Sequence, residues 1–236
     1  MMITGAVIGF IIAVNTQVPI YGFFCAAVAG ALLSVIFALL TQYMMSNQVA
    51  TGLGLTMVGL GLSALIGKPY EGIKSPTLAK IEIPILSDIP ILGPMIFSHD
   101  AIVYFSIFVI ALVAFVINKT RIGLVLRAVG ENQEAAHALG YKVIRIRFIA
   151  IMFGGATAGI GGAYISLARV PQWTEGMTAG AGWIALALVV FASWKPWRVL
   201  LGAYLFGGIT VLQLNLQAIG VAIPVEILSM SPYLVT

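Results

Sequence analysis

The chain has 236 residues, of which 61% are hydrophobic and 8% are charged, and its mean hydropathy is +1.07. Soluble domains carry roughly 25% charged residues, so this composition excludes a water-soluble fold and predicts an integral membrane protein. The net charge of +4 does not indicate nucleic-acid binding, because the basic residues flank apolar runs. The single cysteine, Cys25, excludes a disulfide framework and a cysteine metal site within the chain.

Apolar stretches along the chain approach the roughly 20 residues that a membrane-spanning helix needs. The expected spans are Tyr21–Gln42, Gln48–Gly67, Ala101–Ile117, Phe148–Ala168, Thr178–Trp194 and Val199–Gln217. Met2–Val14 is apolar but too short to cross alone, and Pro232–Thr236 resembles the start of a further span. We therefore expect an all-α fold, a polytopic transmembrane helical bundle. It should have about seven spans in this fragment, be incomplete at both ends, and form one transmembrane domain over residues 1–236.

One internal segment, residues 119–147, gathers charge in a chain whose first 67 residues carry none. Its charged residues are Lys119, Arg121, Arg127, Glu131, Glu134, Lys142, Arg145 and Arg147. Most of them are basic, which indicates a cytoplasmic loop. Strict alternation of the spans then places the loops 68–100 and 169–177 outside, and the short loop with Lys195 and Arg198 inside.

The middle of this charged segment is expected to form a short helix. Asn132 can cap its N-terminus, Glu131 and Glu134 suit the positive end of its dipole, and Gly140 can end it. A small amphipathic helix between two spans is suited to bind a soluble partner. This pattern therefore suggests a transporter subunit that is driven from the cytoplasm.

The predicted outer loop 68–100 contains the near-repeat Ile83-Pro84-Ile85-Leu86 and Ile89-Pro90-Ile91-Leu92. Proline at this spacing forbids a continuous helix and favours an extended chain. The loop can cap the outer mouth of a pathway or dock a partner, and a rigid connector is an equally good interpretation.

Glycines are placed inside the expected spans. The small-xxx-small patterns Gly5–Gly9, Gly155–Gly159 and Ala158–Gly162 predict close helix packing. Four further glycines crowd one span, where they are expected to loosen it locally as in discontinuous helices: Gly52, Gly54, Gly59 and Gly61.

The sequence offers no catalytic site and is not predicted to be an enzyme. It has no phosphate-binding G-x-x-x-x-G-K-[ST] loop, so ATP hydrolysis by this chain is excluded. His99 and His137 lie on opposite sides of the membrane in the predicted topology, which argues against a shared metal site. No acidic residue lies in the middle of a predicted span, which argues against an ion-coupled carrier.

Uncharged polar residues within the spans are the candidates for contact with a neutral, hydroxyl-rich solute. The candidate pathway residues are Asn47, Gln48, Thr51, Thr56, Gln213 and Asn215. Hydrogen bonds between helices would also explain them, because an unpaired polar group in lipid costs a few kcal/mol. The four tryptophans are expected to lie in aromatic belts at the membrane interfaces: Trp173, Trp183, Trp194 and Trp197.

The sequence resembles a family over essentially its whole length. The stretch Arg121-Ile-Gly-Leu, then Arg127-Ala-Val-Gly-Glu-Asn-Gln-Glu-Ala-Ala-His-Ala-Leu-Gly-Tyr and later Gly154-Gly-Ala-Thr-Ala-Gly-Ile-Gly-Gly, is similar to inner-membrane permeases of ABC importers. The similar branch serves branched-chain amino acids, ribose and other simple sugars, and nucleosides. Leu86-Ser-Asp-Ile-Pro-Ile-Leu-Gly-Pro and Asn47-Gln-Val-Ala-Thr-Gly resemble the subgroup for simple sugars and nucleosides, whose binding proteins are often basic-membrane-protein-type lipoproteins.

The resemblance implies a coupling segment within residues 118–147 that fits a cleft in a separate ATPase subunit. The implied coupling residues are Arg127, Glu131, Asn132, Glu134, Ala135, Ala136, His137, Leu139 and Gly140. It also implies a second permease subunit, identical or homologous, an extracytoplasmic substrate-binding lipoprotein and a place in the bacterial inner membrane. ATP would be bound by the partner, and this chain would hold no cofactor. A permease for branched-chain amino acids and a stand-alone carrier or channel remain the alternatives.

Overall fold

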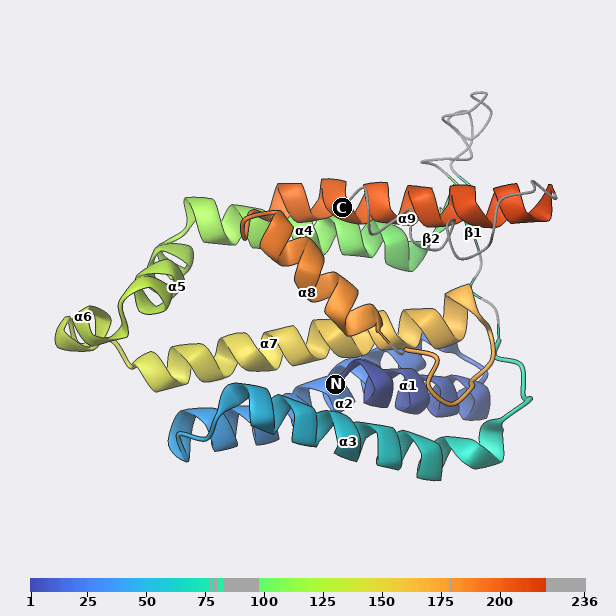
Figure 1. Cartoon of the computed structure of the whole chain (residues 1–236), viewed down its shortest axis with the longest axis horizontal. Coiled ribbons are helices and arrows are strands. Elements are labelled where there is room, and N and C mark those ends of the chain that lie inside the picture. Colours follow the sequence, from blue (N-terminus) through green and yellow to red (C-terminus); the bar gives the residue numbers. More distant parts are fainter. Residues whose placement is uncertain (77, 79, 83–97, 179, 220–236) are drawn as a thin grey trace. The chain divides into compact units, whose positions relative to one another are not determined.

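The computed structural model of the chain is almost entirely helical (Figure 1). It describes residues 1–76, 78, 80–82, 98–178 and 180–219. The only strands among these residues are β1 (Lys80–Glu82) and β2 (Ser98–Asp100), which pair antiparallel with Lys80 opposite Asp100. The predicted all-α fold is therefore confirmed. The proline-rich repeat Ile83–Leu92 and the segment Pro232–Thr236 lie outside the described residues.

The chain divides into two compact units. Unit one consists of Met1–Tyr104 and Leu124–Ala179, and unit two consists of Phe105–Gly123 and Gly180–Thr236. The extent of a single transmembrane domain over residues 1–236 stays a prediction.

The framework of unit one is a group of long helices. Its main members are α1 (Met2–Thr16), α2 (Pro19–Ala38), α3 (Gln48–Gly67) and α7 (Val143–Tyr164). Short π-helical turns extend two of them, η1 (Leu39–Tyr43) after α2 and η4 (Ile165–Arg169) after α7. A 3-10 turn, η2 (Lys68–Tyr70), follows α3.

The ends of these helices follow from local chemistry. Gln17 ends α1 in the left-handed conformation with φ 57°, and Pro19 then begins α2 at a position where its missing N–H costs nothing. Asn47 caps α3, because its Oδ1 accepts hydrogen bonds from the backbone N–H groups of Val49 (2.9 Å) and Ala50 (3.2 Å).

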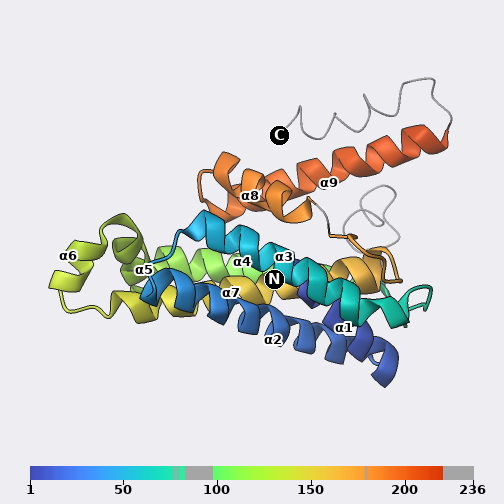
Figure 2. The same cartoon turned by 60° about the horizontal axis from the view of Figure 1, so that its bottom comes forward.

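Glycines bring α1, α2 and α7 into backbone contact. The two views of the cartoon show these three helices side by side (Figures 1 and 2). A Cβ on Gly5 would collide with the backbone of Gly159, and a Cβ on Gly30 would collide with the carbonyl oxygen of Gly155. The predicted use of the small-xxx-small patterns for helix packing is therefore confirmed.

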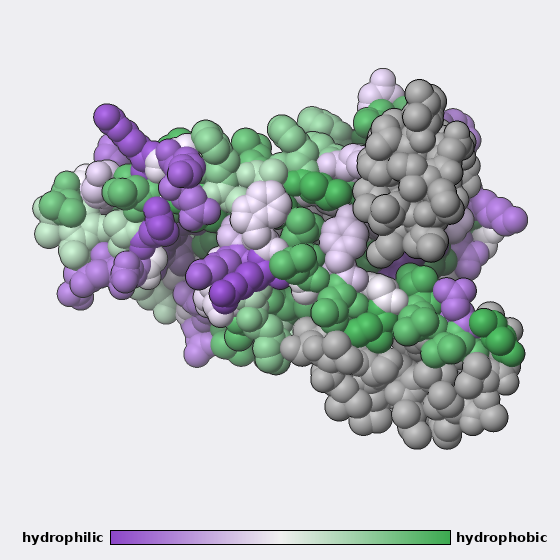
Figure 3. Space-filling view, turned by 90° about the horizontal axis from the view of Figure 1, so that it is seen from above, coloured by the Kyte–Doolittle hydropathy of each residue, from purple (hydrophilic) through white to green (hydrophobic). Residues whose placement is uncertain are grey.

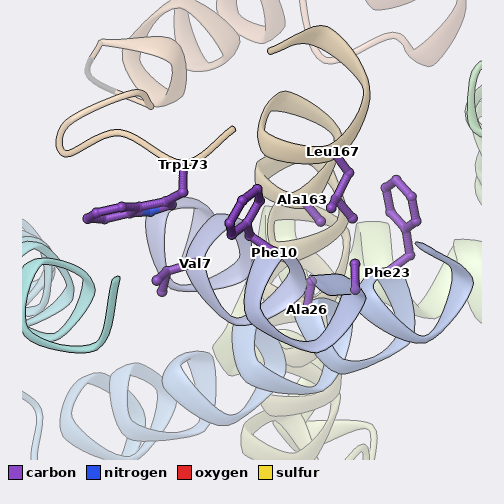
Figure 4. Packing of buried hydrophobic residues seen from close by; sticks show 8 residues of the cluster. Val7, Phe10, Phe23, Ala26, Ala163, Leu167 and Trp173 are labelled. Carbon is purple, nitrogen blue, oxygen red and sulfur yellow. The ribbon is translucent and has the colours of Figure 1, made fainter. Parts of the chain in front are cut away.

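The hydrophobic core of unit one lies where α1, α2 and α7 meet. Its buried members are Val7, Phe10, Ala13, Phe23, Ala26, Ala163, Leu167 and Trp173, most of which Figure 4 labels. One polar bond crosses this core: the hydroxyl of Ser166 in η4 donates to the carbonyl of Ala6 in α1 at 2.9 Å. Trp173 was expected at a membrane interface. That prediction is wrong, since the side chain is only 1% exposed and packs in the core.

A second correction concerns the glycine-rich span. The glycines at positions 52, 54, 59 and 61 do not interrupt α3, because α3 is a continuous α-helix from Gln48 to Gly67. Gly59 is instead a packing position, where a Cβ would lie 3.2 Å from the Cγ2 of Ile3 in α1. Backbone hydrogen bonding along the helix outweighs the weak helix propensity of glycine.

The remaining helices connect or form unit two. They are α4 (Ala101–Lys119), α5 (Arg121–Glu131), α6 (Gln133–Ala138), α8 (Ala181–Phe191) and α9 (Pro196–Ala218). The expected span Thr178–Trp194 is too long, since α8 has only 11 residues. It ends at Phe191 because Ser193 and Trp194 adopt positive φ angles of 52° and 60°.

Four helices of the described chain are long and apolar enough to cross a membrane. They are Pro19–Tyr43, Gln48–Tyr70, Ala101–Lys119 and Val143–Arg169. Three shorter apolar helices cover Met2–Thr16, Ala181–Phe191 and Pro196–Leu212. Large apolar side chains are exposed on the long helices, for example Phe24 (70%), Met57 (70%) and Leu65 (76%). These exposed surfaces indicate a multi-pass membrane protein.

Candidate functional site

The charged segment forms two helices between α4 and α7. The hydroxyl of Thr120 accepts a hydrogen bond from the backbone N–H of Gly123 (3.2 Å) at the start of α5. A Cβ on Gly123 would collide with the backbone of Val116 and Ile117, so glycine permits the tight turn from α4 to α5. Hydrophilic side chains gather at the end of the molecule that carries α5 and α6, on the left in Figure 3. The predicted short helix is α6, and a second helix, α5, precedes it.

The N-terminus of α6 is capped as the sequence predicted. Asn132 has extended backbone angles (φ −146°, ψ 102°), and its Oδ1 accepts a hydrogen bond from the N–H of Ala135 at 3.0 Å. Glu134 lies in the first turn of α6, at the positive end of its dipole. Glu131 is the last residue of α5 and directly precedes the cap residue Asn132, so Glu134 is the acidic residue in the first turn of α6.

The C-terminus of α6 is closed by two backbone hydrogen bonds. The N–H of Gly140 donates to the carbonyl of His137 (2.9 Å), and the N–H of Tyr141 donates to the carbonyl of Ala136 (3.1 Å). This pair of bonds is a Schellman motif, which needs a left-handed residue after the helix. Gly140 supplies it with φ +85°. The prediction that Gly140 ends this helix is confirmed.

A small core holds α6 against its neighbours. Ala136 (2% exposed) packs with Val129 of α5 (2%) and Val143 of α7 (8%), and Val125 and Ile146 complete the cluster. Ala136 therefore positions the helix and is not available for contact with a partner. Because this cluster joins side chains of three successive helices, the position of α6 depends on the position of the start of α7.

The outward face of α6 and of the turn after it is exposed. Leu139 is 75% exposed and Tyr141 is 41% exposed. The other exposed residues of the candidate coupling set are Arg127, Glu131, Asn132, Glu134, Ala135, His137 and Gly140. The candidate set omitted Tyr141. The sequence feature that could have identified Tyr141 is its position as an aromatic residue directly after the glycine that ends the helix.

Two candidate pathway residues at the start of α3 donate hydrogen bonds to backbone carbonyls one turn earlier. The hydroxyl of Thr51 donates to the carbonyl of Asn47 (2.8 Å), and the hydroxyl of Thr56 donates to the carbonyl of Gly52 (2.8 Å). Gln48 is exposed beside them. The hydroxyl of Thr51 also lies 2.9 Å from that of Ser46, which donates to the carbonyl of Leu40 in η1 (2.8 Å). Thr51 therefore takes part in a link between α3 and the end of α2, whereas the bond of Thr56 runs within α3 alone.

The other pathway candidates lie in α9 of unit two. The Nδ2 of Asn215 donates to the carbonyl of Val211 (3.0 Å), again within the helix. The side chain of Gln213 lies outside the described part of the chain. A role of any of these residues in contact with a solute stays a prediction.

Comparisons with known proteins agree with this architecture. A family described as "Branched-chain amino acid transport system / permease component" matches residues 1–234. The chain is 37% identical to the putative glucose ABC transporter permease protein TsgC13 of Haloferax volcanii, over 94% of this chain and 69% of that protein. It is 34% identical to the guanosine ABC transporter permease protein NupQ of Bacillus subtilis, over 92% and 71%. It is 31% identical to the nucleoside ABC transporter permease protein NupC of Lactococcus lactis, over 94% and 72%. No solved structure matches the chain significantly.

Proposed function

Because the chain belongs to the family of branched-chain amino acid transport system permease components, we propose that it is the permease subunit of a binding-protein-dependent ABC importer. It moves a solute across the cytoplasmic membrane while a separate subunit hydrolyses ATP. The observation that carries this proposal is the α6 site, a short exposed helix fixed at both ends and seated on a small core. A membrane helix bundle with such a rigid projecting helix is suited to receive movement from a soluble motor.

The α6 helix is the contact with the ATPase subunit. Leu139 and Tyr141 supply exposed apolar surface, and Glu134, His137 and Arg127 supply polar groups around it. An apolar centre with a polar rim is the usual anatomy of a protein interface. The small core of Val129, Ala136 and Val143 transmits displacement of α6 to α7, which is a membrane-spanning helix.

The proposed substrates are nucleosides or simple sugars. The support is similarity to permeases named for glucose, guanosine and nucleosides, each matched over more than nine-tenths of this chain. Branched-chain amino acids are the alternative, because the family description names them. The alternative from another class is a carrier or channel that works without an ATPase. Such a protein has no need of the α6 site, so this alternative leaves that site unexplained.

The proposed complex contains a second permease subunit, identical or homologous, two ATPase domains and an extracytoplasmic substrate-binding lipoprotein. The membrane is the bacterial inner membrane. The test is mild-detergent purification of the full-length protein from its native membrane, with mass spectrometry of the proteins that accompany it. Recovery of a Walker-motif ATPase and a binding lipoprotein would support the importer, and the ligand of the lipoprotein would name the substrate. Reproducible recovery of the permease alone would contradict the proposal.

A further inference from the structure

A loop in unit one inserts a tryptophan into the helix bundle. This loop, residues 170–178, follows η4 and is called the strap here. Its Trp173 is 1% exposed and packs with Val7 and Phe10 of α1 (Figure 4). The indole also lies directly on Gly67 at the end of α3, where a Cβ would be 2.6 Å from its Cε2 atom. Trp173 therefore fills a slot between α1 and α3 that exists only because residue 67 has no side chain.

The strap is held to the chain that follows α3 by a few backbone contacts. The N–H of Ser75 donates to the carbonyl of Pro171 (3.0 Å), and single bridges pair Lys74 with Gln172 and Glu71 with Trp173. Residues 71–75 and 171–173 thus meet at one end of unit one, as expected for parts of two loops on the same side of a membrane. The α6 site lies at the other end of α7 and η4, whose 27 residues extend about 40 Å.

The buried position of Trp173 leaves one of its polar groups without a hydrogen-bond partner among the described residues. Within the part of the chain that the structure describes, the buried indole Nε1–H of Trp173 has no hydrogen-bond acceptor. A buried donor without an acceptor costs free energy that a solvated donor does not. The unpaired N–H therefore offsets part of the stability that burial of the indole contributes, so less free energy is needed to release Trp173 from the slot.

The backbone around the strap is suited to such movement. A π-helical turn, η4, directly precedes the strap, and π-turns are less stable than α-helix and are frequent at functional sites. Gly176 near the end of the strap and Gly180 just beyond it adopt φ angles of +74° and +79°. The hydroxyl of Ser166 in η4 lies 2.9 Å from the carbonyl of Ala6 and 3.2 Å from that of Ala163, so it can bond α1 or its own helix.

We propose that Trp173 is a gate residue of the transport cycle. In its slot, it holds the end of α3 at Gly67 against Val7 and Phe10 of α1, at the side opposite the coupling helix. It leaves the slot when that end opens, and the strap is the element that carries it. This inference rests on the proposed transport function, because a gate has meaning only in a protein that passes a solute.

The test locks the strap with a reversible disulfide. Lys74 and Gln172 are exposed antiparallel bridge partners, whose Cα atoms are within the distance that a disulfide spans. The variant Lys74→Cys/Gln172→Cys is made in a Cys25→Ala background, which removes the native thiol. The complete transporter, with its ATPase and binding lipoprotein, is placed in proteoliposomes. Uptake of radiolabelled guanosine and glucose is measured before oxidation, after oxidation and after dithiothreitol.

The expected result is at least a tenfold loss of uptake on oxidation, with full recovery after reduction. Each single-cysteine variant should be unaffected. Joining the two cysteines with a long flexible bifunctional thiol reagent should leave most uptake, because it modifies both residues without holding the strap. Unchanged uptake by the fully oxidised pair would overturn the gate, and failure of the pair to cross-link would overturn the seated geometry. Absence of both guanosine and glucose uptake by the unmodified transporter would instead contradict the proposed function.

Discussion

Replacing Gly140 by alanine isolates the backbone requirement of the coupling helix. The residue has φ +85°, and no atom lies within 4 Å of the position that a Cβ would take. Alanine therefore meets no steric obstacle, and its cost is the left-handed conformation alone, roughly 1–2 kcal/mol for an L-residue. A cost of this size shifts the equilibrium between the closed and the frayed C-terminal end of α6 by about 5–30-fold toward the frayed end. A six-residue helix cannot compensate through its own hydrogen bonds.

Gly130 supplies the matched control, because a Cβ there also meets no atom within 4 Å but the residue lies in α5, with no positive φ. The Gly130→Ala variant should insert and transport like the wild type. Gly140→Ala should insert normally and lose most ATP-driven uptake, and Gly140→Val should abolish uptake because a β-branched residue tolerates this conformation even less. Gly140→Asn should fall between glycine and alanine. The assay is uptake by proteoliposomes at equal permease content. Wild-type uptake by Gly140→Ala would refute the reasoning.

Two further changes test the remaining contacts. Asn132→Ala removes the acceptor for the N–H of Ala135 and should cost about 1 kcal/mol of α6 stability. Substrate-stimulated ATP hydrolysis should fall, whereas Asn132→Asp keeps the acceptor and most of the activity; equal losses in both variants would contradict the capping role. Gly159→Ala places a Cβ against the carbonyl of Ala26, so the detergent-solubilised protein should unfold at a lower temperature. Gly161→Ala meets open space in the same helix, and an equal fall in its unfolding temperature would contradict the packing.

The α6 site was largely predictable from the sequence. Asn132 and Gly140 act through local backbone geometry, and such capping interactions depend on residues a few positions apart. The burial of Ala136 was not predictable in this way. It depends on Val129 and Val143, whose packing against α6 follows from the relative course of three helices. Local signals therefore identified where α6 begins and ends, but not which of its faces is buried.

The role of Trp173 could not be read from its sequence neighbourhood. A tryptophan beside a predicted interface is typical of an aromatic belt. The side chains of Trp183, Trp194 and Trp197 are 67%, 71% and 53% exposed, and their place in such a belt stays a prediction. Trp173 differs because Gly67, more than 100 positions earlier in the chain, leaves room for its indole. The slot exists only once α3 and the strap have come together, and no short sequence pattern encodes that contact.

The coupling assignment is tested most directly by cross-linking from the exposed face of the α6 turn. Leu139 (75% exposed) and Leu65 on α3 (76% exposed) are the same residue type with nearly the same exposure. Each is replaced by cysteine in a Cys25→Ala background, and the full transporter in native membranes is treated with a short thiol-to-amine cross-linker. The coupling assignment predicts that Leu139→Cys is joined to the ATPase subunit and Leu65→Cys is not. Equal cross-linking of both, or none from Leu139→Cys in a complex that contains the ATPase, would contradict it.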